Sequence, residues 1–332
     1  MNPLAVAIVS YETRQALDRC LTALRTALPP GADVVVVDNA SSDGSAEMVA
    51  REHGWARLLA LEKNRGFAAG VNAALAASDA PLVLVLNPDV EVNREGIDRL
   101  LAAADRDPAP AGVAPLLVGA DGRPQTGLYR RAPTRAQIVL FWTLLALLAR
   151  RVPTLRRRWL EHDLRSGGIL PVDQLPGGAM LLSRAAIERV GTLDEGYFMW
   201  FEDVDWSYRA RQAGHELLVD THARFRHEGG ASFRGWGLDR RLFQFYRAGL
   251  RFLAKHASPC VRALAVALIP RDFALRSALL VAARRGSLLH ARESRAAIRR
   301  VAREIGAGRV PDFTGPGPDD MTLPGAPAEA RP

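Results

Sequence analysis

The sequence is poor in cysteine, with only Cys20 and Cys260 among its 332 residues. Two distant cysteines give no spacing for a zinc site and no disulfide framework, which fits a reducing cytoplasm. Long hydrophobic runs are also lacking. The nearest, Ile138–Leu148, is much shorter than the ~20 apolar residues of a membrane-spanning helix. The residues after Met1 lack the basic and apolar regions of a signal peptide, so we expect a cytoplasmic protein without a spanning helix.

Two functional classes are disfavoured by missing motifs. A dinucleotide-binding oxidoreductase needs a glycine-rich turn after its first strand, but Ser10, Tyr11 and Glu12 stand there instead. The formal charge of +8 fits nucleic acid, anionic lipid or a phosphate-bearing substrate, and also an arginine-rich surface without function. No nucleic-acid recognition motif accompanies this charge, so we expect no nucleic-acid partner.

The first half of the chain alternates short apolar runs with helical patterns. This order predicts an α/β fold with a mainly parallel, Rossmann-like sheet flanked by helices, whose ligands lie beyond the carboxyl ends of the strands. The predicted strands are Ala5–Ser10, Val34–Val37, Leu58–Leu61 and Leu82–Leu86, and the predicted helices are Arg14–Leu28, Ser42–His53 and Gly66–Ser78.

The second half is less regular. Arg135–Arg151 has the composition of an apolar helix, Asp203–Gln212 of a further helix, and the chain after Leu238 of amphipathic helices. Proline, glycine, alanine and aspartate dominate from Gly306, which predicts disorder. We therefore expect a catalytic domain at 1–235, with halves 1–115 and 116–235, a helical region at 236–305, and a disordered tail at 306–332.

Two strand ends carry oxygen side chains suited to a nucleotide diphosphate. Asp38 follows four valines, and a carboxylate there can accept the imide N–H of uracil or thymine. Asn87 and Asp89 follow Leu82–Leu86, and a hard cation such as Mg²⁺ or Mn²⁺ takes such oxygens together with those of a diphosphate. The alternatives are structural: a turn rich in N-cap residues after Asp38 and an Asx-Pro turn at Asn87.

Three acids within four residues, Glu202, Asp203 and Asp205, begin a predicted helix among aromatic residues. The helix dipole lowers the cost of their mutual repulsion. Capping explains one acid but hardly three. A carboxylate surrounded by aromatic rings can have a raised pKa and act as a general base. We therefore interpret the cluster as functional.

Two further segments have both a functional and a structural interpretation. His227 is a candidate ligand for a borderline metal such as Mn²⁺, although a single histidine is more often structural. Asn64, Arg65 and Gly66 precede a helix whose free N–H groups bind anions, and Arg65 can add a phosphate contact. The alternative for this second segment is close helix–sheet packing through Gly70.

Together these motifs resemble the family 2 glycosyltransferases, which have the GT-A fold. The resemblance runs from about Val6 to Ser232 and rests on five motifs in order: Ser-Tyr near the N-terminus, Val-Val-Val-Asp-Asn-Ala-Ser-Ser-Asp-Gly-Ser, Asn-Arg-Gly-Phe-Ala-Ala-Gly-Val-Asn, Leu-Asn-Pro-Asp, and Glu-Asp-Val-Asp-Trp followed by His227. Leu-Asn-Pro-Asp, with Pro-Gly-Gly-Ala-Met and Phe-Glu-Asp-Val-Asp, is most similar to the rhamnosyltransferase branch. Those enzymes use dTDP-L-rhamnose and often a polyprenyl-diphosphate-linked acceptor.

The resemblance implies a role for each motif. Asp203 would be the catalytic base, while Asp89 and His227 would hold Mg²⁺ or Mn²⁺, with Asn87 in place of the first aspartate of the family's Asp-x-Asp motif. The donor-binding residues would be Ser10, Tyr11, Glu12, Asp38, Asn39, Asn64, Arg65, Gly66, Asn72 and Asn87, and the acceptor-side residues would be Gly177, Gly178, Trp200 and Glu202.

The expected reaction is a single inverting displacement at the anomeric carbon, with the metal on the leaving diphosphate and Asp203 on the acceptor hydroxyl. The expected acceptor is a glycan or a polyprenyl-diphosphate-linked sugar in cell-envelope polysaccharide synthesis. The enzyme would lie peripherally on the inner face of the plasma membrane, through Arg135–Arg158 and the helices after Leu238. Alternatives are a UDP-sugar donor and a non-catalytic nucleotide-binding protein at the membrane. The oligomeric state stays open.

Overall fold

The computed structural model describes residues 4–131, 152, 154, 161–231 and 235–322. The chain divides into two compact units. The first falls in the ranges Met1–Ala132, Arg156–Asp194 and Glu202–Arg234, and the second in Pro133–Leu155, Glu195–Phe201 and Gly235–Pro332. The predicted apolar helix Arg135–Arg151 lies outside the described residues, as do Arg156, Arg157 and Arg158.

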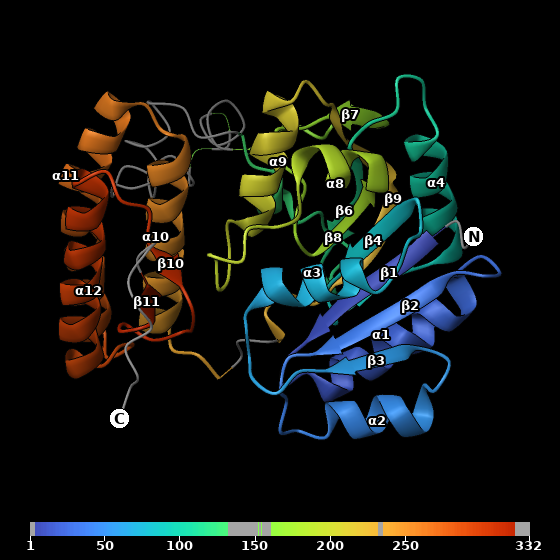
Figure 1. Cartoon of the computed structure of the whole chain (residues 1–332), viewed down its shortest axis with the longest axis horizontal. Helices are drawn as coiled ribbons and strands as arrows, with labels where there is room; N and C mark the ends of the chain where they lie inside the picture. Colours follow the sequence, from blue (N-terminus) through green and yellow to red (C-terminus); the bar gives the residue numbers. More distant parts are fainter. Residues whose placement is uncertain (1–3, 132–151, 153, 155–160, 232–234, 323–332) are drawn as a thin grey trace. The chain divides into compact units, whose positions relative to one another are not determined.

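Four parallel strands form one half of the sheet of the first unit (Figure 1). They are ordered β3-β2-β1-β4 and comprise β1 (Leu4–Ser10), β2 (Asp33–Asp38), β3 (Arg57–Ala60) and β4 (Leu82–Leu86). Successive residues of a strand point to opposite faces, and β1, β2 and β4 bury both faces. This explains why these strands are unbroken apolar runs, and it confirms their prediction.

The other half of the sheet is mixed. Strand β8 (Ala179–Ser183) runs antiparallel between β4 and β6 (Gly112–Val118), and β9 (Leu217–His227) runs parallel to β6. Two short strands, β5 (Val90–Glu91) and β7 (Ile169–Pro171), pair antiparallel with β9. The predicted α/β class is confirmed, with β8 as the antiparallel insertion in a mainly parallel order.

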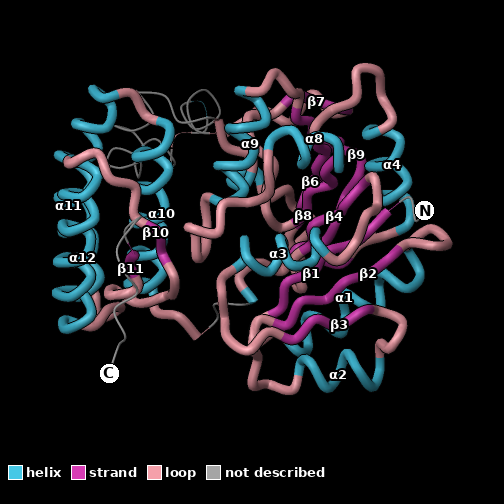
Figure 2. The backbone as a smooth tube through the Cα atoms, in the orientation of Figure 1, coloured by secondary structure: helices cyan, strands magenta, loops and turns pink. Residues whose placement is uncertain are grey.

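Helices cover both faces of this sheet. One hydrophobic core joins the sheet to α1 (Arg14–Ala27), α2 (Ser45–Glu52) and α4 (Arg94–Ala104). A second core, on the opposite face, joins it to α3 (Phe67–Ala76), α8 (Arg184–Val190) and α9 (Glu202–Gln212). Figure 2 shows these helices around the strands. The close-packing role considered for Gly70 is observed, because a Cβ there would lie 2.6 Å from Val9 Cγ1.

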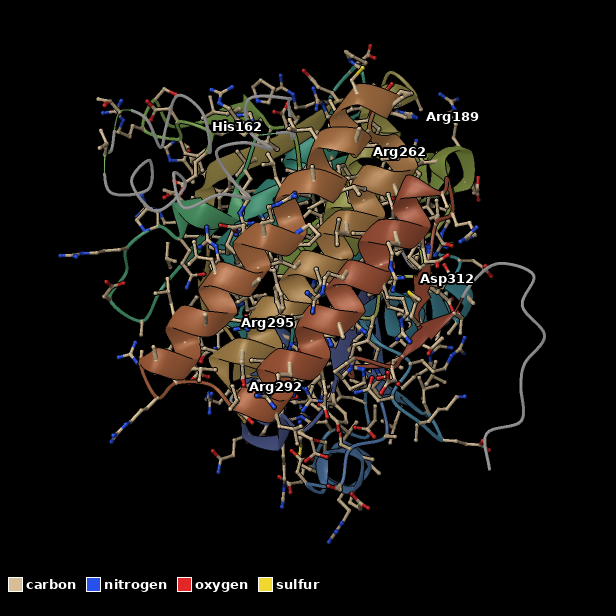
Figure 3. All side chains as sticks on the ribbon, turned by 90° about the vertical axis from the view of Figure 1, so that its left-hand side faces the viewer. His162, Arg189, Arg262, Arg292, Arg295 and Asp312 are labelled. Atoms are coloured by element: carbon tan, nitrogen blue, oxygen red, sulfur yellow. The ribbon has the colours of Figure 1, made fainter. Side chains whose placement is uncertain are left out.

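The second unit is built on three long helices. They are α10 (Leu238–His256), α11 (Pro259–Ala282) and α12 (Leu288–Gly306), and each contacts the other two. Figure 3 shows them side by side. Phe243, Tyr246 and Phe273 make edge-on ring contacts inside the unit, and Ile298 is fully buried. These are the predicted C-terminal amphipathic helices. Among the described residues, no helix combines the length and apolar character needed to cross a bilayer.

The chain after α12 differs from the predicted disordered tail as far as Thr322. Two short strands, β10 (Asp312–Phe313) and β11 (Met321–Thr322), pair antiparallel. The buried Arg247 guanidinium donates to the carbonyls of Gly315 and Gly317, and Arg251 donates to Asp312 Oδ1 at 2.6 Å. Two arginines from α10 therefore satisfy the polar groups of a segment whose composition alone indicates disorder. Residues 323–332 lie outside the described part of the chain.

Candidate active site

The parallel strands bring several predicted donor-binding residues to one edge of the sheet. Ser10 and Asp38 are register partners at the carboxyl ends of β1 and β2, and Asn87 directly follows β4. Asp38 is 3% exposed, and its Oδ2 accepts from Ser41 N–H at 2.9 Å. Its Oδ1 is buried and has no hydrogen-bond partner among the described residues. A buried carboxylate oxygen without a donor is costly, so Asp38 is suited to a ligand that brings an N–H.

Asn39 connects this strand end to the loop before α3. Its Nδ2 donates to Gly66 O at 3.0 Å, and its Oδ1 accepts from Arg65 N–H at 2.9 Å. Asn64 Oδ1 in turn accepts from Gly66 N–H at 2.9 Å. Gly66 is the N-cap of α3 with φ of +88°, a conformation that glycine adopts without strain. The structure thus gathers Asn39, Asn64, Arg65 and Gly66 at one helix N-terminus.

Glu12 is part of the same edge and has a left-handed backbone with φ of +53°. Its Oε1 accepts from the N–H of Ser42 at 2.7 Å and from the Ser42 hydroxyl at 2.9 Å. Ser10 Oγ forms a buried hydrogen bond with Thr13 Oγ1, and Tyr11 is half-buried between them in sequence. These contacts fix the turn after β1 against the turn after β2.

Asn72 is placed differently from the other predicted donor-binding residues. Its Nδ2 donates to Leu193 O at 2.8 Å, and its Oδ1 accepts from Leu193 N–H at 3.1 Å. Both polar atoms of the Asn72 amide therefore bond to the backbone of Leu193, which follows α8. The contacts of Asn72 are those of a residue that ties α3 to the loop after α8.

The β5–β9 pairing brings Asp89 to His227. Val90 is the register partner of His227, and Glu228 N–H donates to Asp89 O at 3.0 Å. The two side chains face each other, with Asp89 Oδ1 3.5 Å from His227 Nε2. Burial raises the pKa of Asp89, but the hydrogen bond and charge of His227 and the hydrogen bond from Ala231 N–H outweigh it. The pKa is therefore lowered overall, which keeps the carboxylate charged.

Gln125 fixes the orientation of the His227 ring. Gln125 Nε2 donates to the backbone carbonyl of His227 at 2.9 Å, so its Oε1 is the atom that faces His227 Nδ1 at 2.6 Å. An amide oxygen only accepts, and Nδ1 must therefore carry a proton. The remaining nitrogen, Nε2, is directed at Asp89. The hydrogen bond to Asp89 needs a proton on Nε2 as long as no cation is bound. Once that proton is lost, the Nε2 lone pair and the carboxylate are a donor set that suits a divalent cation.

The described residues contain no group of three His, Cys, Asp or Glu side chains that could hold a metal ion. Asp89 and His227 offer one oxygen and one nitrogen, so an ion at this position would need further ligands from a substrate. A diphosphate supplies such oxygens. The two residues present therefore fit a cation that binds together with a nucleotide diphosphate.

Asp203 lies at the beginning of α9, and two backbone N–H groups hold its carboxylate. Gly177 N–H donates to its Oδ2 at 2.8 Å, and Val204 N–H donates to its Oδ1 at 2.8 Å. Asp205, the third acid of the cluster, is fully buried and accepts from Arg209 Nε at 2.8 Å. Asp205 therefore has a structural ion pair, and the two candidates for a general base are Asp203 and Glu202.

The surroundings of the two remaining acids affect their pKa values differently. Burial raises the pKa of Glu202 well above its usual range, and the neighbouring Asp203 charge raises it further. Burial also raises the pKa of Asp203, but the N–H groups of Gly177 and Val204 and the Arg130 guanidinium oppose the rise. Burial therefore favours a proton on Glu202 over one on Asp203, whose charge is supported by two N–H donors, as the charge of a general base needs to be.

Two adjacent glycines connect Asp203 to the Asp89–His227 pair. A Cβ on Gly177 would lie 3.1 Å from Asp203 Oδ2, and a Cβ on Gly178 would lie 3.7 Å from His227 Nε2. Asn87 N–H also donates to Gly178 O at 2.9 Å. The loop before β8 therefore runs between the two groups, and the lack of a side chain on Gly177 lets Asp203 approach its backbone closely.

Trp200, predicted on the acceptor side, belongs to the second unit. Its ring meets Phe245 edge-on with centroids 6.4 Å apart, and Phe201 contacts Phe245 and Phe252. Both Trp200 and Phe201 have left-handed backbones, with φ of +66° and +70°. Consecutive non-glycine residues in this region are strained, and such strain is concentrated at functional sites. The segment stands directly before Glu202 in the chain.

A cavity of about 350 Å³ lies elsewhere in the first unit. Thr126, His162, Arg165 and His222 are among its lining residues, and none of the predicted site residues lines it. Ser10, Asp38 and Asn87 lie instead at the ends of the parallel strands.

Sequence reasoning missed Gln125 and Arg130. Both follow β6 in a segment without regular secondary structure beyond one 3₁₀ turn, η1 (Thr126–Leu128). Neither residue stands at a strand end or in a motif, so the sequence carries no signal for the hydrogen bonds of Gln125 with His227 or for the effect of the Arg130 charge on Asp203.

Known proteins place the chain in a family. The sequence profile described as Glycosyl transferase family 2 matches residues 5–164. N-acetylglucosaminyl-diphospho-decaprenol L-rhamnosyltransferase of Mycobacterium tuberculosis (strain ATCC 25618 / H37Rv) is 31% identical over 291 residues, which are 84% of this chain and 92% of the relative. Low-salt glycan biosynthesis hexosyltransferase Agl10 of Haloferax volcanii is 29% identical over 64% of this chain and 62% of its own. The chain belongs to glycosyl transferase family 2.

Solved structures show the same fold. Mannosyltransferase PcManGT from Pyrobaculum calidifontis, in complex with GDP-Man and Mn²⁺, has a TM-score of 0.51 at 16% identity and covers 92% of this chain and 83% of its own. GalNAc-T7 with UDP, GalNAc and Mn²⁺ has a TM-score of 0.51 at 18% identity. This match covers 75% of this chain and 47% of GalNAc-T7, so the chain spans about half of that protein. The predicted GT-A fold and the predicted rhamnosyltransferase-like family are confirmed.

Proposed function

We propose that this enzyme transfers L-rhamnose from dTDP-L-rhamnose to a hydroxyl of a polyprenyl-diphosphate-linked sugar in cell-envelope polysaccharide synthesis. The similarity to the mycobacterial decaprenol-dependent rhamnosyltransferase supports the donor and the acceptor class. The observation that carries the catalytic assignment is the placement of Asp203. Its carboxylate is held by Gly177 N–H, and the next residue, Gly178, lies against His227 and Asn87.

The donor base would bind at Asp38. The unpartnered Asp38 Oδ1 accepts the imide N–H that thymine and uracil both carry, and this single contact does not distinguish dTDP from UDP. The diphosphate would lie toward the N-terminus of α3, whose first N–H groups have no partner within the helix and favour anions. Arg65, which is exposed at this terminus, adds positive charge.

Asp89 and His227 would hold Mg²⁺ or Mn²⁺ together with the diphosphate oxygens. When bound, such a cation supplies Lewis-acid stabilisation of the charge that develops on the leaving diphosphate. Gln125 keeps the proton on His227 Nδ1, and the carboxylate of Asp89 stays ionised because its pKa is lowered.

Asp203 would accept the proton of the acceptor hydroxyl. The acceptor oxygen then forms a bond to the anomeric carbon as the bond from that carbon to the diphosphate oxygen breaks. A single displacement of this kind inverts the anomeric configuration, in the manner of inverting glycosidases with the acceptor in place of water. Because burial favours a proton on Glu202, Asp203 would be the base of this pair.

The enzyme would work peripherally at the inner face of the plasma membrane, because a polyprenyl-linked acceptor stays in the bilayer. Apart from Val152 and Thr154, the basic segment Arg135–Arg158 of this proposal lies outside the described residues.

A donor screen tests the proposal. Purified enzyme is incubated with dTDP-L-rhamnose, dTDP-glucose, UDP-glucose or UDP-N-acetylglucosamine, with a short-chain polyprenyl-diphosphate-linked N-acetylglucosamine, and with Mn²⁺, Mg²⁺ or chelator. We expect a glycosylated lipid product from dTDP-L-rhamnose that requires a divalent cation. Preferential transfer from a UDP-sugar would replace the donor assignment. Nucleotide binding without transfer from any donor would favour a non-catalytic protein.

A further inference from the structure

Large hydrophobic side chains are exposed together at one end of the helical unit. Their exposed fractions lie between 44% and 66%, and they make up five of the seven large hydrophobic side chains exposed among the described residues. The five residues, which we call the leucine end, are Leu238, Leu275, Leu279, Leu288 and Leu289.

Three observations place these residues at the same end. Leu275 and Leu279 lie on the last turns of α11, and Leu288 begins α12 after a short turn. Asp239 Oδ2 accepts from Ser287 N–H at 3.0 Å, which ties the start of α10 to the start of α12. Figure 3 shows Arg262, near the start of α11, and Arg292, near the start of α12, toward opposite ends of the helical group.

The surroundings of the leucine end are basic. From Arg271 to Glu293 the chain contains five arginines and two acids. One of these acids, Asp272, is buried and accepts from Arg276 Nε at 2.8 Å, so its charge is matched inside the unit. The remaining arginines are exposed: Arg271, Arg284, Arg285 and Arg292.

We propose that the leucine end inserts into the surface of an anionic bilayer, with Arg284, Arg285 and Arg292 at the lipid phosphates. Exposed leucines beside arginines are the composition of an interfacial membrane surface, in which apolar side chains enter the acyl boundary and basic side chains remain at the headgroups. The proposed function supplies the reason for such a surface, because its acceptor is anchored in a bilayer.

A second copy of this chain fits the leucine end less well than an anionic bilayer does. The symmetric contact that is commonest in homodimers would place the leucine end against itself, and the excess of arginine would then meet like charge. Anionic headgroups instead complement this charge. The positive charge that would oppose dimerisation at this surface therefore favours binding to an anionic membrane.

Vesicle sedimentation of the full chain tests the inference. The vesicles are phosphatidylcholine alone or phosphatidylcholine mixed with phosphatidylglycerol, at low and high salt. We expect binding to the mixed vesicles only, weakened by salt. Replacing Arg284 and Arg285 by serine should lower the affinity about 30-fold, since each basic residue contributes roughly fivefold. Replacing Leu288 and Leu289 by serine should lower it at least about tenfold.

Matched variants in the first unit serve as controls. Trp55 is the exposed large hydrophobic residue of that unit chosen for comparison, and Arg51 and Arg106 are exposed arginines there. The Trp55→Ser variant and the Arg51→Ser, Arg106→Ser double variant should bind vesicles as the wild type does. Equal losses in test and control variants would show a general charge or stability effect and overturn the assignment.

A site-specific probe reports on insertion directly. In a Cys260→Ser background, Leu289→Cys carries the only exposed thiol among the described residues, because Cys20 is fully buried. An environment-sensitive fluorophore on this thiol should shift to the blue with anionic vesicles, and the same label at Trp55→Cys should not. An unchanged spectrum at position 289 would overturn insertion.

The outcomes separate this inference from the proposed function. Transfer to a short-chain soluble acceptor without vesicles depends on the catalytic residues alone, and all leucine-end variants should retain it. If the wild type transfers the sugar but does not bind vesicles, the assignment of the leucine end as a membrane surface is overturned, while the enzyme assignment stands. A change in molecular mass by sedimentation velocity on replacing Leu288 and Leu289, with no vesicle binding, would identify a second copy as the occupant and also overturn it.

Discussion

Gln125 Oε1 lies 2.6 Å from His227 Nδ1, and the same amide donates to the His227 carbonyl at 2.9 Å. This two-point contact determines which ring nitrogen carries the proton. It leaves Nε2 for Asp89 and for a cation, so Gln125 acts as a positioning residue rather than a ligand.

The first prediction concerns Gln125→Leu. Loss of the amide should free the His227 ring and weaken Mn²⁺-dependent dTDP binding about 10- to 100-fold, the usual effect of removing a group that orients a metal ligand. Titration calorimetry with dTDP at several Mn²⁺ concentrations measures this effect. Asp89→Ala and His227→Ala should remove the Mn²⁺ dependence altogether.

Gln212→Leu, a change at an exposed glutamine of α9, is the matched control and should bind like the wild type. If Gln125→Leu binds dTDP with the wild-type Mn²⁺ dependence and an unchanged unfolding temperature, Gln125 does not position His227.

The second prediction separates the roles of the two adjacent acids. Glu202→Gln imitates the protonated form that burial already favours, so turnover should stay within about threefold of the wild type. A large loss of turnover with intact dTDP binding would mean that Glu202 shares in the proton transfer.

Glu202→Gln should also change the pH dependence of stability. The folded-state pKa of Glu202 is raised, so the folded protein binds this proton more tightly than the unfolded chain does. The stability that this proton contributes is therefore lost from the wild type as the pH rises above the unfolded pKa of about 4.3, and the variant lacks this contribution to the pH dependence. Chemical denaturation between acidic and neutral pH should show a stability difference that grows in favour of the variant. A constant difference would contradict the raised pKa.

The third prediction is a pH–rate profile. Asp203 must be deprotonated to act, and its pKa is raised above the ordinary value of about 3.9 by burial. The acid limb of kcat/KM should therefore fall at a higher pH than for an exposed aspartate, with full activity above this limb. A profile that stays flat down to the pKa of an exposed aspartate would contradict a buried base. The profile should be measured over a range where circular dichroism shows the fold intact.

The fourth prediction tests the glycine that holds the base. A Cβ at Gly177 would lie 3.1 Å from Asp203 Oδ2, so Gly177→Ala should displace the carboxylate. We expect kcat to fall about 10- to 100-fold, because small misplacements of a reacting group have effects of this order. Gly54→Ala is the control, since its nearest atom would be an ordinary contact at 3.7 Å. A Gly177→Ala variant with wild-type kcat would show that the close approach is not needed.

The elements that could be predicted are those whose pattern of apolar residues lies within the element itself. Strands β1, β2 and β4 are buried on both faces, and this burial requires the apolar runs by which they were predicted. Strand β6 was not predicted, and it is interrupted by a register shift after Pro115. The order of β10 and β11 depends on Arg247 and Arg251, which lie more than fifty residues earlier in the chain. Such long-range contacts leave no periodic pattern.

The same distinction holds in the candidate site. Asp38, Asn87 and Asp203 stand where a strand ends or a helix begins, so their position follows from the local pattern. The function of Gln125 depends on a hydrogen bond across 102 residues of sequence. The positions of Gly177 and Gly178 between two groups likewise emerge only when β8 is placed beside β4.

The most direct measurement is the transfer rate of the Asp203→Asn variant with dTDP-L-rhamnose and the lipid-linked acceptor, together with the anomeric configuration of the wild-type product. A general base contributes ~10²–10⁴-fold, so the variant should lose at least about 100-fold in kcat while its dTDP affinity stays within about threefold. The wild-type product should have the configuration opposite to that of the donor. More than about a tenth of the wild-type rate in the variant, or retention of configuration in the product, would contradict the assignment of Asp203 as the base of an inverting transfer.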